Sequence, residues 1–135
     1  MNKIPIKYYN KFDFVWSNCA LEHLGSMNHG VEFIFSSLKC LRSGGVAVHT
    51  TEFNVSSNMR IIDSEGLYVF RRYDIETIIF ECQKQGYRIS INWDFGNSFA
   101  DYHVALPPYN GPRHLKLKIG DFTVTSIGLI IIKQL

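Results

Sequence analysis

The alternation of apolar and polar residues between positions 12 and 54 predicts one strand–helix–strand unit, and the rest of the chain is arranged around it. Short apolar runs at positions 12–17 and 46–52 indicate strands, and residues of helical periodicity lie between them. Strands joined by a crossover helix lie parallel, with a right-handed connection. Ligands of such units collect at the carboxyl ends of the strands. We therefore expect any site near positions 17–19 and 50–54.

The crossover helix is predicted from an N-cap at Asn28 to a left-handed stop at Gly44-Gly45. The glycine pair has a second interpretation as a phosphate cradle. We reject it because no strand precedes the pair and no Gly-Lys-Ser/Thr sequence follows it. The apolar stripe of this helix consists of Val31, Ile34, Phe35, Leu38 and Leu41.

Downstream, the pattern predicts a helix, a strand and a hairpin. Asp74 is the expected N-cap of the helix, and Gly86 its end. Residues 88–94 alternate strictly, as a strand with one wet face does. Residues 115–119 and 122–133 flank a two-residue turn, and the continuously apolar section 127–132 is expected to be central in the sheet. The polar connection 54–66 is of the kind that covers a site.

Composition narrows the class of protein. A length of 135 residues suggests one domain. An aromatic content of 14% is high, and we interpret the excess as buried or interfacial surface. The net charge of +2 is not clustered, which argues against nucleic acid as a partner. Three cysteines without a Cys-x-x-Cys pair indicate neither a zinc site nor a disulfide framework, and they favour a cytoplasmic protein with reduced thiols. Neither a signal peptide nor a membrane span is indicated.

Three strings, "FDFVWSNCALEHLGS", "LKCLRSGGVAVHTTEFN" and "TSIGLIIIK", resemble the second half of a class I S-adenosylmethionine-dependent methyltransferase domain of the type 11-like group. In that family a polar strand end is followed by a Leu-x-His turn and later by a Leu-x-x-Gly-Gly turn. Leu21-Glu22-His23 and residues 41–45 occupy these positions. The resemblance implies an α/β fold: a partial Rossmann-like sheet of parallel strands with a C-terminal antiparallel hairpin, and helices mainly on one face.

The sequence departs from the family in its first half. It has no glycine-rich loop and no acidic residue for the cofactor ribose before position 12. We therefore expect residues 1–135 to be a single truncated domain that lacks the glycine-rich cofactor-binding half. One sheet face would then be bare and strand 12–17 would be an edge, and such surfaces drive association. This predicts a homodimer, or a complex with a separate chain that supplies the missing half.

The resemblance also implies roles for residues after the first strand. Ser17, Asn18 and Leu21 would approach the cofactor, S-adenosylmethionine. His23 would be a base for the methyl acceptor, with Glu22 as its orienting partner. The alternative is that Glu22 and His23 cap a helical turn and face solvent.

The second strand end has two interpretations as well. Thr50, Thr51, Glu52 and Asn54 could line an acceptor pocket, or could anchor the loop by hydrogen bonds to nearby backbone. From a later loop, Asp101 and His103 could reach the same rim. His49 is expected to be hydrogen-bonded inside the sheet rather than catalytic. No metal ligands are assigned, because His23, His29, His103 and His114 have no recognised spacing.

Together these features predict an S-adenosylmethionine-dependent methyltransferase-like protein that neither binds the cofactor fully nor catalyses alone. Two alternatives stay open. One is a non-catalytic dimeric module that binds a small ligand or nothing. The other is one subunit of a split methyltransferase.

Overall fold

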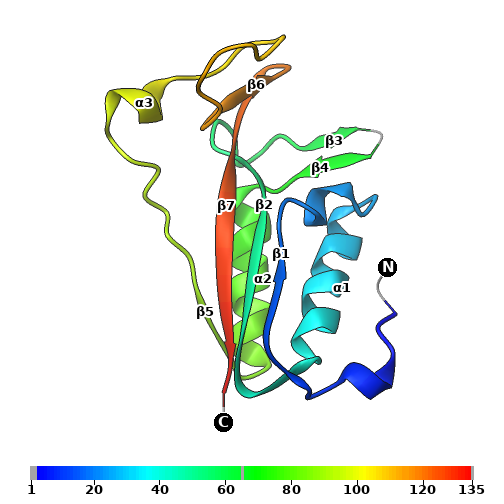
Figure 1. Cartoon of the computed structure of the whole chain (residues 1–135). Helices are drawn as coiled ribbons and strands as arrows, with labels where there is room; N and C mark the ends of the chain where they lie inside the picture. Colours follow the sequence, from blue (N-terminus) through cyan, green and yellow to red (C-terminus); the bar gives the residue numbers. More distant parts are fainter. Residues whose placement is uncertain (1–2, 65, 135) are drawn as a thin grey trace.

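The computed structural model describes residues 3–64 and 66–134, which build a five-stranded sheet and a separate two-stranded hairpin (Figure 1). The large sheet has the order β1-β2-β7-β5, and β6 pairs with one end of β7. The small sheet consists of β3 and β4. The elements are η1 (Ile6–Tyr8), β1 (Phe12–Ser17), η2 (Leu21–His23), α1 (Met27–Leu38), β2 (Leu41–Asn54), β3 (Ile62–Ser64), β4 (Leu67–Val69), α2 (Arg72–Lys84), β5 (Tyr87–Ser90), α3 (Phe99–Tyr102), β6 (Leu117–Ile119) and β7 (Phe122–Lys133).

The predicted strand–helix–strand unit is confirmed. β1 and β2 are parallel, and Ser17 pairs with His49, so both strands end at the same edge. β7 is antiparallel to β2 on one side and to β5 on the other, which confirms its expected central position. The result is a mixed α/β sheet whose polar strand ends meet beside η2.

Both long helices cover one face of the sheet. In Figure 1, α2 lies behind β2 and β7, and α1 lies beside β1. The apolar spacing predicted for each helix supplies this packing, because Ile34 and Leu38 of α1 and Ile75 and Ile78 of α2 are fully buried. Sheet residues of the same face complete the core: Ala47, Leu129 and Ile131. Within the described ranges, no helix is long and apolar enough to cross a membrane.

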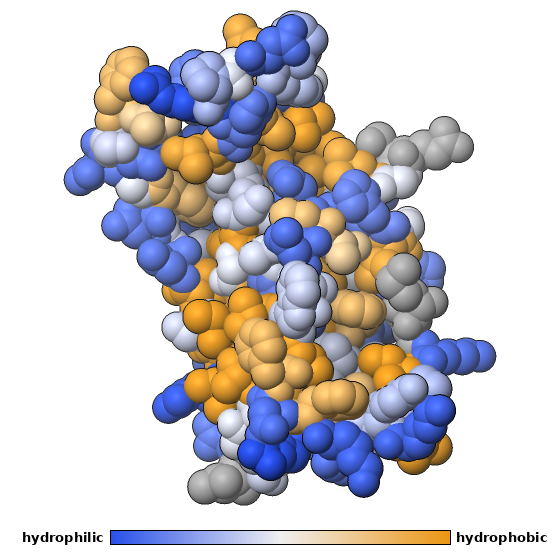
Figure 2. All heavy atoms as spheres, in the orientation of Figure 1, coloured by the Kyte–Doolittle hydropathy of each residue, from blue (hydrophilic) through white to orange (hydrophobic). Residues whose placement is uncertain are grey.

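Among the described residues, no α-helix of the core cluster packs on the opposite face of the sheet. On β1 the side chains of Phe12, Phe14 and Trp16 point to this face and are 41%, 52% and 67% exposed. On the central strand, Ile130 is 45% exposed. β1 is therefore an edge strand with one uncovered face, as expected from the sequence. Figure 2 views this side and shows hydrophobic side chains gathered over the lower part of the sheet.

We call this surface the bare face. The strand register defines it: Phe14 lies beside Val46, and Trp16 lies beside Val48. Val46 and Val48 in turn pair with Ile132 and Ile130 of β7. The bare face therefore consists of Phe12, Phe14, Trp16, Val46, Val48, Ile130 and Ile132.

The first helix differs from its predicted bounds at both ends. Ser26, not Asn28, is the N-cap, since its side chain accepts a 3.2 Å hydrogen bond from the His29 amide. The helix stops at Leu38 because Leu41 already pairs with Phe12 in the sheet. The expected glycine stop consequently lies inside β2, where Gly44 has a φ of +77°.

The N-cap of the second helix lies three residues before the predicted Asp74. Arg71 is the N-cap, and Asp74 at the third helical position accepts its backbone N–H. In the connection 54–66, predicted as loop, residues 62–64 form β3, which pairs with β4. The alternating segment 88–94 leaves the sheet after Ser90, but its apolar side still packs on the core as predicted.

Candidate functional site

The two parallel strand ends are joined by a short hydrogen-bond network. The amide of Cys19 donates to the carbonyl and to the hydroxyl of Thr50, at 3.1 and 3.0 Å. That hydroxyl donates in turn to Oδ1 of Asn18, at 2.7 Å. Cys19 itself has a φ of +44°, in the left-handed region. Asn18 and Thr50 therefore hold the turn after β1 against the end of β2, which is the anchoring interpretation of Thr50.

His49 is buried in the sheet, as predicted. Its Nδ1 lies 2.8 Å from the Ser17 hydroxyl, and its Nε2 lies 3.1 Å from the Ser37 hydroxyl. Ser37 donates its proton to the carbonyl of Ile34, so it accepts from Nε2–H of His49. Nδ1 must then accept from Ser17. Burial lowers the pKa of His49 to about 4, so the neutral ring is a structural element.

Glu22 lies in a different environment from the one expected. Its side chain is fully buried, and Oε2 accepts a 2.9 Å hydrogen bond from the hydroxyl of Thr51. The described residues give its other oxygen, Oε1, no hydrogen-bond partner. A buried carboxylate oxygen without a partner is costly and requires an explanation.

The side chains of His23 and Glu22 have different hydrogen-bond partners. His23 is exposed, and its Nδ1 lies 3.0 Å from the carbonyl oxygen of Gly66. Since a carbonyl only accepts, Nδ1 carries the proton and Nε2 is the basic nitrogen of the neutral ring. The proposed orientation of His23 by Glu22 is therefore wrong, because Gly66 holds the imidazole and Thr51 holds the carboxylate.

Three side chains with ligand atoms meet at the strand ends. Atoms of Cys19, Glu22 and Glu52 lie within 4.8 Å of one another. Burial raises the pKa of Glu52, the charge of Glu22 raises it further, and the charge of His23 lowers it. The sequence predicted that these residues lie at the same edge of the sheet, but it did not predict that they approach one another.

The other two expected cofactor residues have structural neighbours. Ser17 is half-buried and its hydroxyl bonds His49. Leu21 is fully buried in the core cluster, so its side chain packs rather than facing a ligand. Asn18 is the exposed member of the three.

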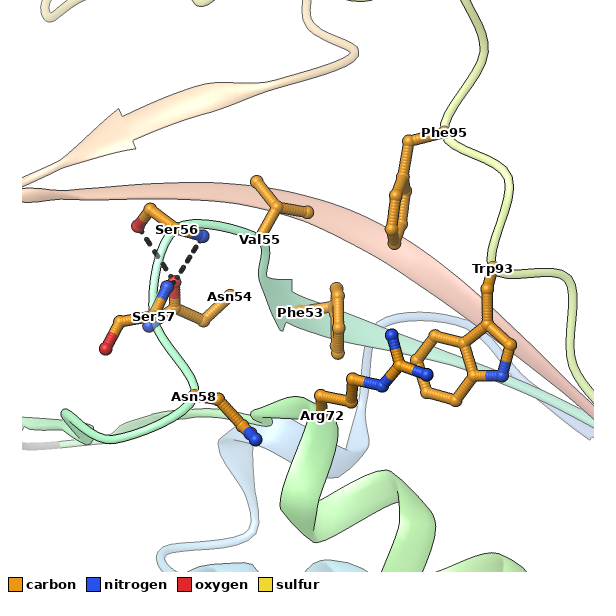
Figure 3. Close-up of a pocket in the computed structure, with 9 residues that line it drawn as sticks. All are labelled: Phe53, Asn54, Val55, Ser56, Ser57, Asn58, Arg72, Trp93 and Phe95. Carbon is orange, nitrogen blue, oxygen red and sulfur yellow. Dashed lines mark hydrogen bonds between the residues drawn. The ribbon is translucent and has the colours of Figure 1, made fainter.

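A pocket of about 250 Å³ lies beyond the end of β2 (Figure 3). Its aromatic wall includes Phe53, whose ring stacks on Phe95 with centroids 5.6 Å apart. The guanidinium of Arg72 lies 4.8 Å from the centre of the Trp93 ring. The opposite wall is the polar turn 54–58, which Asn54 shapes by accepting hydrogen bonds from Ser56 and Ser57.

Asn54 was the only pocket residue chosen from sequence. Its Nδ2 is buried and has no hydrogen-bond partner among the described residues. Phe53, Arg72, Trp93 and Phe95 were not predicted as site residues. The excess of aromatic residues was the available signal, but it did not indicate which rings would meet.

Asp101 and His103 lie on and just after α3. The carboxylate of Asp101 accepts from the amide and hydroxyl of Ser98, and these hydrogen bonds lower its pKa. Asp101 lines a second pocket that also includes Ser126, whose hydroxyl lies 3.7 Å from the thiol of Cys19. His103 is the exposed C-cap residue of α3.

The sheet order, the parallel βαβ unit and the C-terminal antiparallel strands define a methyltransferase-like α/β fold. Two solved structures are similar in fold. The [4+2]-cyclase SpnF is 17% identical with a TM-score of 0.58, over 99% of this chain and 54% of the cyclase chain. An S-adenosylmethionine-dependent methyltransferase from Methanosarcina mazei is 10% identical with a TM-score of 0.50, over 95% of this chain and 62% of that chain. This chain thus spans between one half and two thirds of each neighbour. No protein-family model and no curated protein sequence matches it.

Proposed function

We propose that this chain is an S-adenosylmethionine-dependent methyltransferase-like protein whose strand ends form one wall of the cofactor site. The fold similarity to a methyltransferase and the polar ends of β1 and β2 support this assignment. The sequence has no Gly-x-Gly turn with which to cradle the methionine end of the cofactor. In this proposal the isolated chain binds the cofactor weakly and does not transfer methyl groups by itself.

The bare face is the observation that supports the proposal of an incomplete domain. At about 200 Å² for each aromatic side chain, the exposed parts of Phe12, Phe14 and Trp16 amount to roughly 300 Å² of apolar surface. Patches of this size on soluble proteins are associated with binding. Beside β1, a hollow of about 370 Å³ adds Ile4 and Tyr8 to the same apolar edge. In this proposal a second chain binds at the aromatic edge strand β1.

The second chain that we propose is another copy of this protein. β1 can pair antiparallel with β1 of the other copy about a twofold axis at Val15, which extends both sheets into one. This register places Phe14 opposite Trp16 of the other copy on the bare face, and cross-strand aromatic pairs of this kind are stabilising. It places Asp13 opposite Ser17, so no like charges meet.

Cofactor binding by the isolated chain tests the first part. Ligand-observed NMR with S-adenosylmethionine should give a Kd on the order of 1 mM, since one wall of a site supplies little binding energy. Asn18→Ala should weaken binding several-fold, whereas Asn28→Ala, on the exposed surface of α1, should leave it unchanged. A Kd in the micromolar range would contradict the incomplete site. No binding at several millimolar would contradict the cofactor assignment.

Sedimentation tests the second part. The wild-type protein at tens of micromolar should have twice the chain mass of 15.6 kDa. Trp16→Lys should yield the monomer, because it places a charge in the proposed interface. Phe80→Lys is the matched control, since Phe80 is 62% exposed but lies on α2. A monomeric wild type, or dissociation by both substitutions alike, would rule out the proposed dimer.

The pocket in Figure 3 favours a second candidate, a small-ligand-binding module. Its stacked rings suit a planar molecule, and the Arg72 guanidinium and the Asn54 amide suit an anionic or carbonyl-bearing one. In a Trp16→Phe background, Trp93 is the single tryptophan reporter. Benzoate should change its fluorescence, and Arg72→Ala should reduce the effect. An unchanged emission at millimolar benzoate would argue against this candidate.

A further inference from the structure

The cluster of Cys19, Glu22 and Glu52 brings together a thiol and two carboxylates from two separate parts of the chain. Cys19 and Glu22 follow β1, whereas Glu52 lies near the end of β2. One ligand atom of each lies within 4.8 Å of the others. The parallel pairing of β1 with β2 creates this arrangement, because it aligns the two strand ends.

The carboxylate of Glu22 lacks compensation for its burial. Its residue is 0% exposed, Thr51 satisfies only Oε2, and Oε1 is buried without a hydrogen-bond partner. No described Lys or Arg forms an ion pair with Glu22 or Glu52. An isolated buried charge of this kind is stable only when it is paired, protonated or bound to a metal.

We propose that Cys19, Glu22 and Glu52 together bind one Zn²⁺ ion. Thiolate, imidazole and carboxylate are the ligands that zinc takes in proteins, usually in tetrahedral geometry. The hard cations Mg²⁺ and Ca²⁺ instead require oxygen ligands, so the thiol selects against them. This inference does not depend on the methyltransferase assignment.

The geometry fits three protein ligands and an open fourth position. Zinc–sulfur and zinc–oxygen bonds of about 2.3 and 2.1 Å set ligand atoms about 3.5 Å apart in a tetrahedron. The three side chains would therefore close by roughly 1 Å on binding. Cys19 and Glu52 are half-buried, so the open position faces the outside of the strand ends. The exposed His23, whose charge acts on Glu52, lies near this cluster.

The hydroxyl groups around Cys19 support its orientation. Its Sγ lies 3.7 Å from Thr50 Oγ1 and 3.7 Å from Ser126 Oγ. The Ser126 hydroxyl can donate to the thiolate, as outer-shell partners do in other metal sites, whereas the Thr50 hydroxyl donates to Asn18. The sequence did not predict this site because Glu52 is thirty residues from Glu22 and forms no metal-binding spacing with it.

Cobalt titration of the chelator-treated full chain tests the proposal. One equivalent of Co²⁺ should produce a thiolate-to-cobalt charge-transfer band and tetrahedral visible bands, and one equivalent of Zn²⁺ should remove them. Cys19→Ala should abolish the charge-transfer band. Glu52→Gln should weaken binding at least tenfold. Circular dichroism spectra of the variants test whether each of them is folded.

Cys40→Ala is the matched control. Cys40 is a buried thiol that follows α1 in the sequence, whereas Cys19 and Glu22 precede this helix, and its Sγ is bonded to the Ser36 carbonyl. It should keep the full cobalt spectrum. Zinc should also raise the Tm of the wild type but not of Cys19→Ala, since an ion that binds only the folded state stabilises the folded state. Absence of a charge-transfer band in the wild type, or its persistence in Cys19→Ala, would overturn the proposal.

Discussion

Thr51 donates a 2.9 Å hydrogen bond to Oε2 of Glu22, and both side chains are fully buried. This contact ties the turn after β1 to the end of β2 from inside the core. The sequence suggested both residues for a ligand site, one as a catalytic partner and one as a pocket wall. Thr51 therefore supports the site from below, and Glu22 keeps its second carboxylate oxygen for the proposed zinc ion.

Removal of this hydrogen bond should destabilise the fold. Thr51→Val keeps the shape of the side chain but leaves both oxygens of Glu22 unsatisfied, at a cost of about 1–3 kcal/mol in the free energy of unfolding. Urea denaturation measures the loss. Thr77→Val is the control, because Thr77 is exposed on α2 and water replaces its hydrogen bond to Tyr73. Equal effects of the two substitutions would contradict the buried role of Thr51.

Protonation of His49 should destabilise the protein in mild acid. Burial lowers the pKa of His49 to about 4 in the folded state, from about 6.5 when unfolded. The folded state therefore favours the neutral ring. Its contribution, on the order of 3 kcal/mol, is complete above pH 6.5 and is lost as the pH falls towards 4.

The pH dependence of unfolding in urea measures this effect. His49→Gln should flatten the profile between pH 6.5 and 4 relative to the wild type. His114→Gln should leave it unchanged, because His114 is exposed. If the His49 variant keeps the wild-type slope, another group causes it, and that group is not Glu52, because the raised pKa of Glu52 acts in the opposite direction.

Gly30→Ala should destabilise the protein even though alanine favours helices. A Cβ at Gly30 would lie 2.9 Å from the ring of Phe70 and 3.2 Å from the carbonyl oxygen of Leu21. The gain from helix propensity is only about 1 kcal/mol, and overpacking costs about 1–3 kcal/mol. The Tm should fall, whereas Asn28→Ala on the exposed side of the same helix should raise it slightly. A higher Tm for Gly30→Ala would show that α1 can shift away from η2.

Asp74 should be the most sensitive charged residue of the described chain. It is 1% exposed and accepts hydrogen bonds from the backbone and guanidinium of Arg71 and from the hydroxyl of Tyr68. Asp74→Ala leaves a poorly compensated Arg71 and removes the helix cap, at a cost of about 3 kcal/mol. Thermal unfolding measures the loss.

Asp121→Ala is the comparison for Asp74→Ala. The Asp121 carboxylate is 79% exposed and pairs with Arg60 at 3.4 Å, so its loss should change stability by less than about 0.5 kcal/mol. A loss at Asp121 as large as that at Asp74 would contradict the importance of burial for these ion pairs.

The sequence by itself determined the helices, the central strand and the parallel βαβ unit. Ile34 and Leu38, and likewise Ile75 and Ile78, are spaced so that one helical face is apolar, and this property is local to each segment. The alternation of Leu117 and Ile119 with lysines, followed by Gly120-Asp121, likewise located the hairpin before β7. The polar residues after each strand then located the edge of the sheet where a site would lie.

Only the tertiary structure decided what surrounds each residue at that edge. Phe14 and Trp16 are exposed because the helices cover the other face of β1, and a local pattern does not give the side on which helices pack. The sequence predicts Glu22 as a polar turn residue. It is nevertheless buried, because α1 and β2 pack against η2. Burial depends on which distant segments pack on a side chain, and the charge neighbours of Cys19 and Glu52 depend on strand register, neither of which a local pattern encodes.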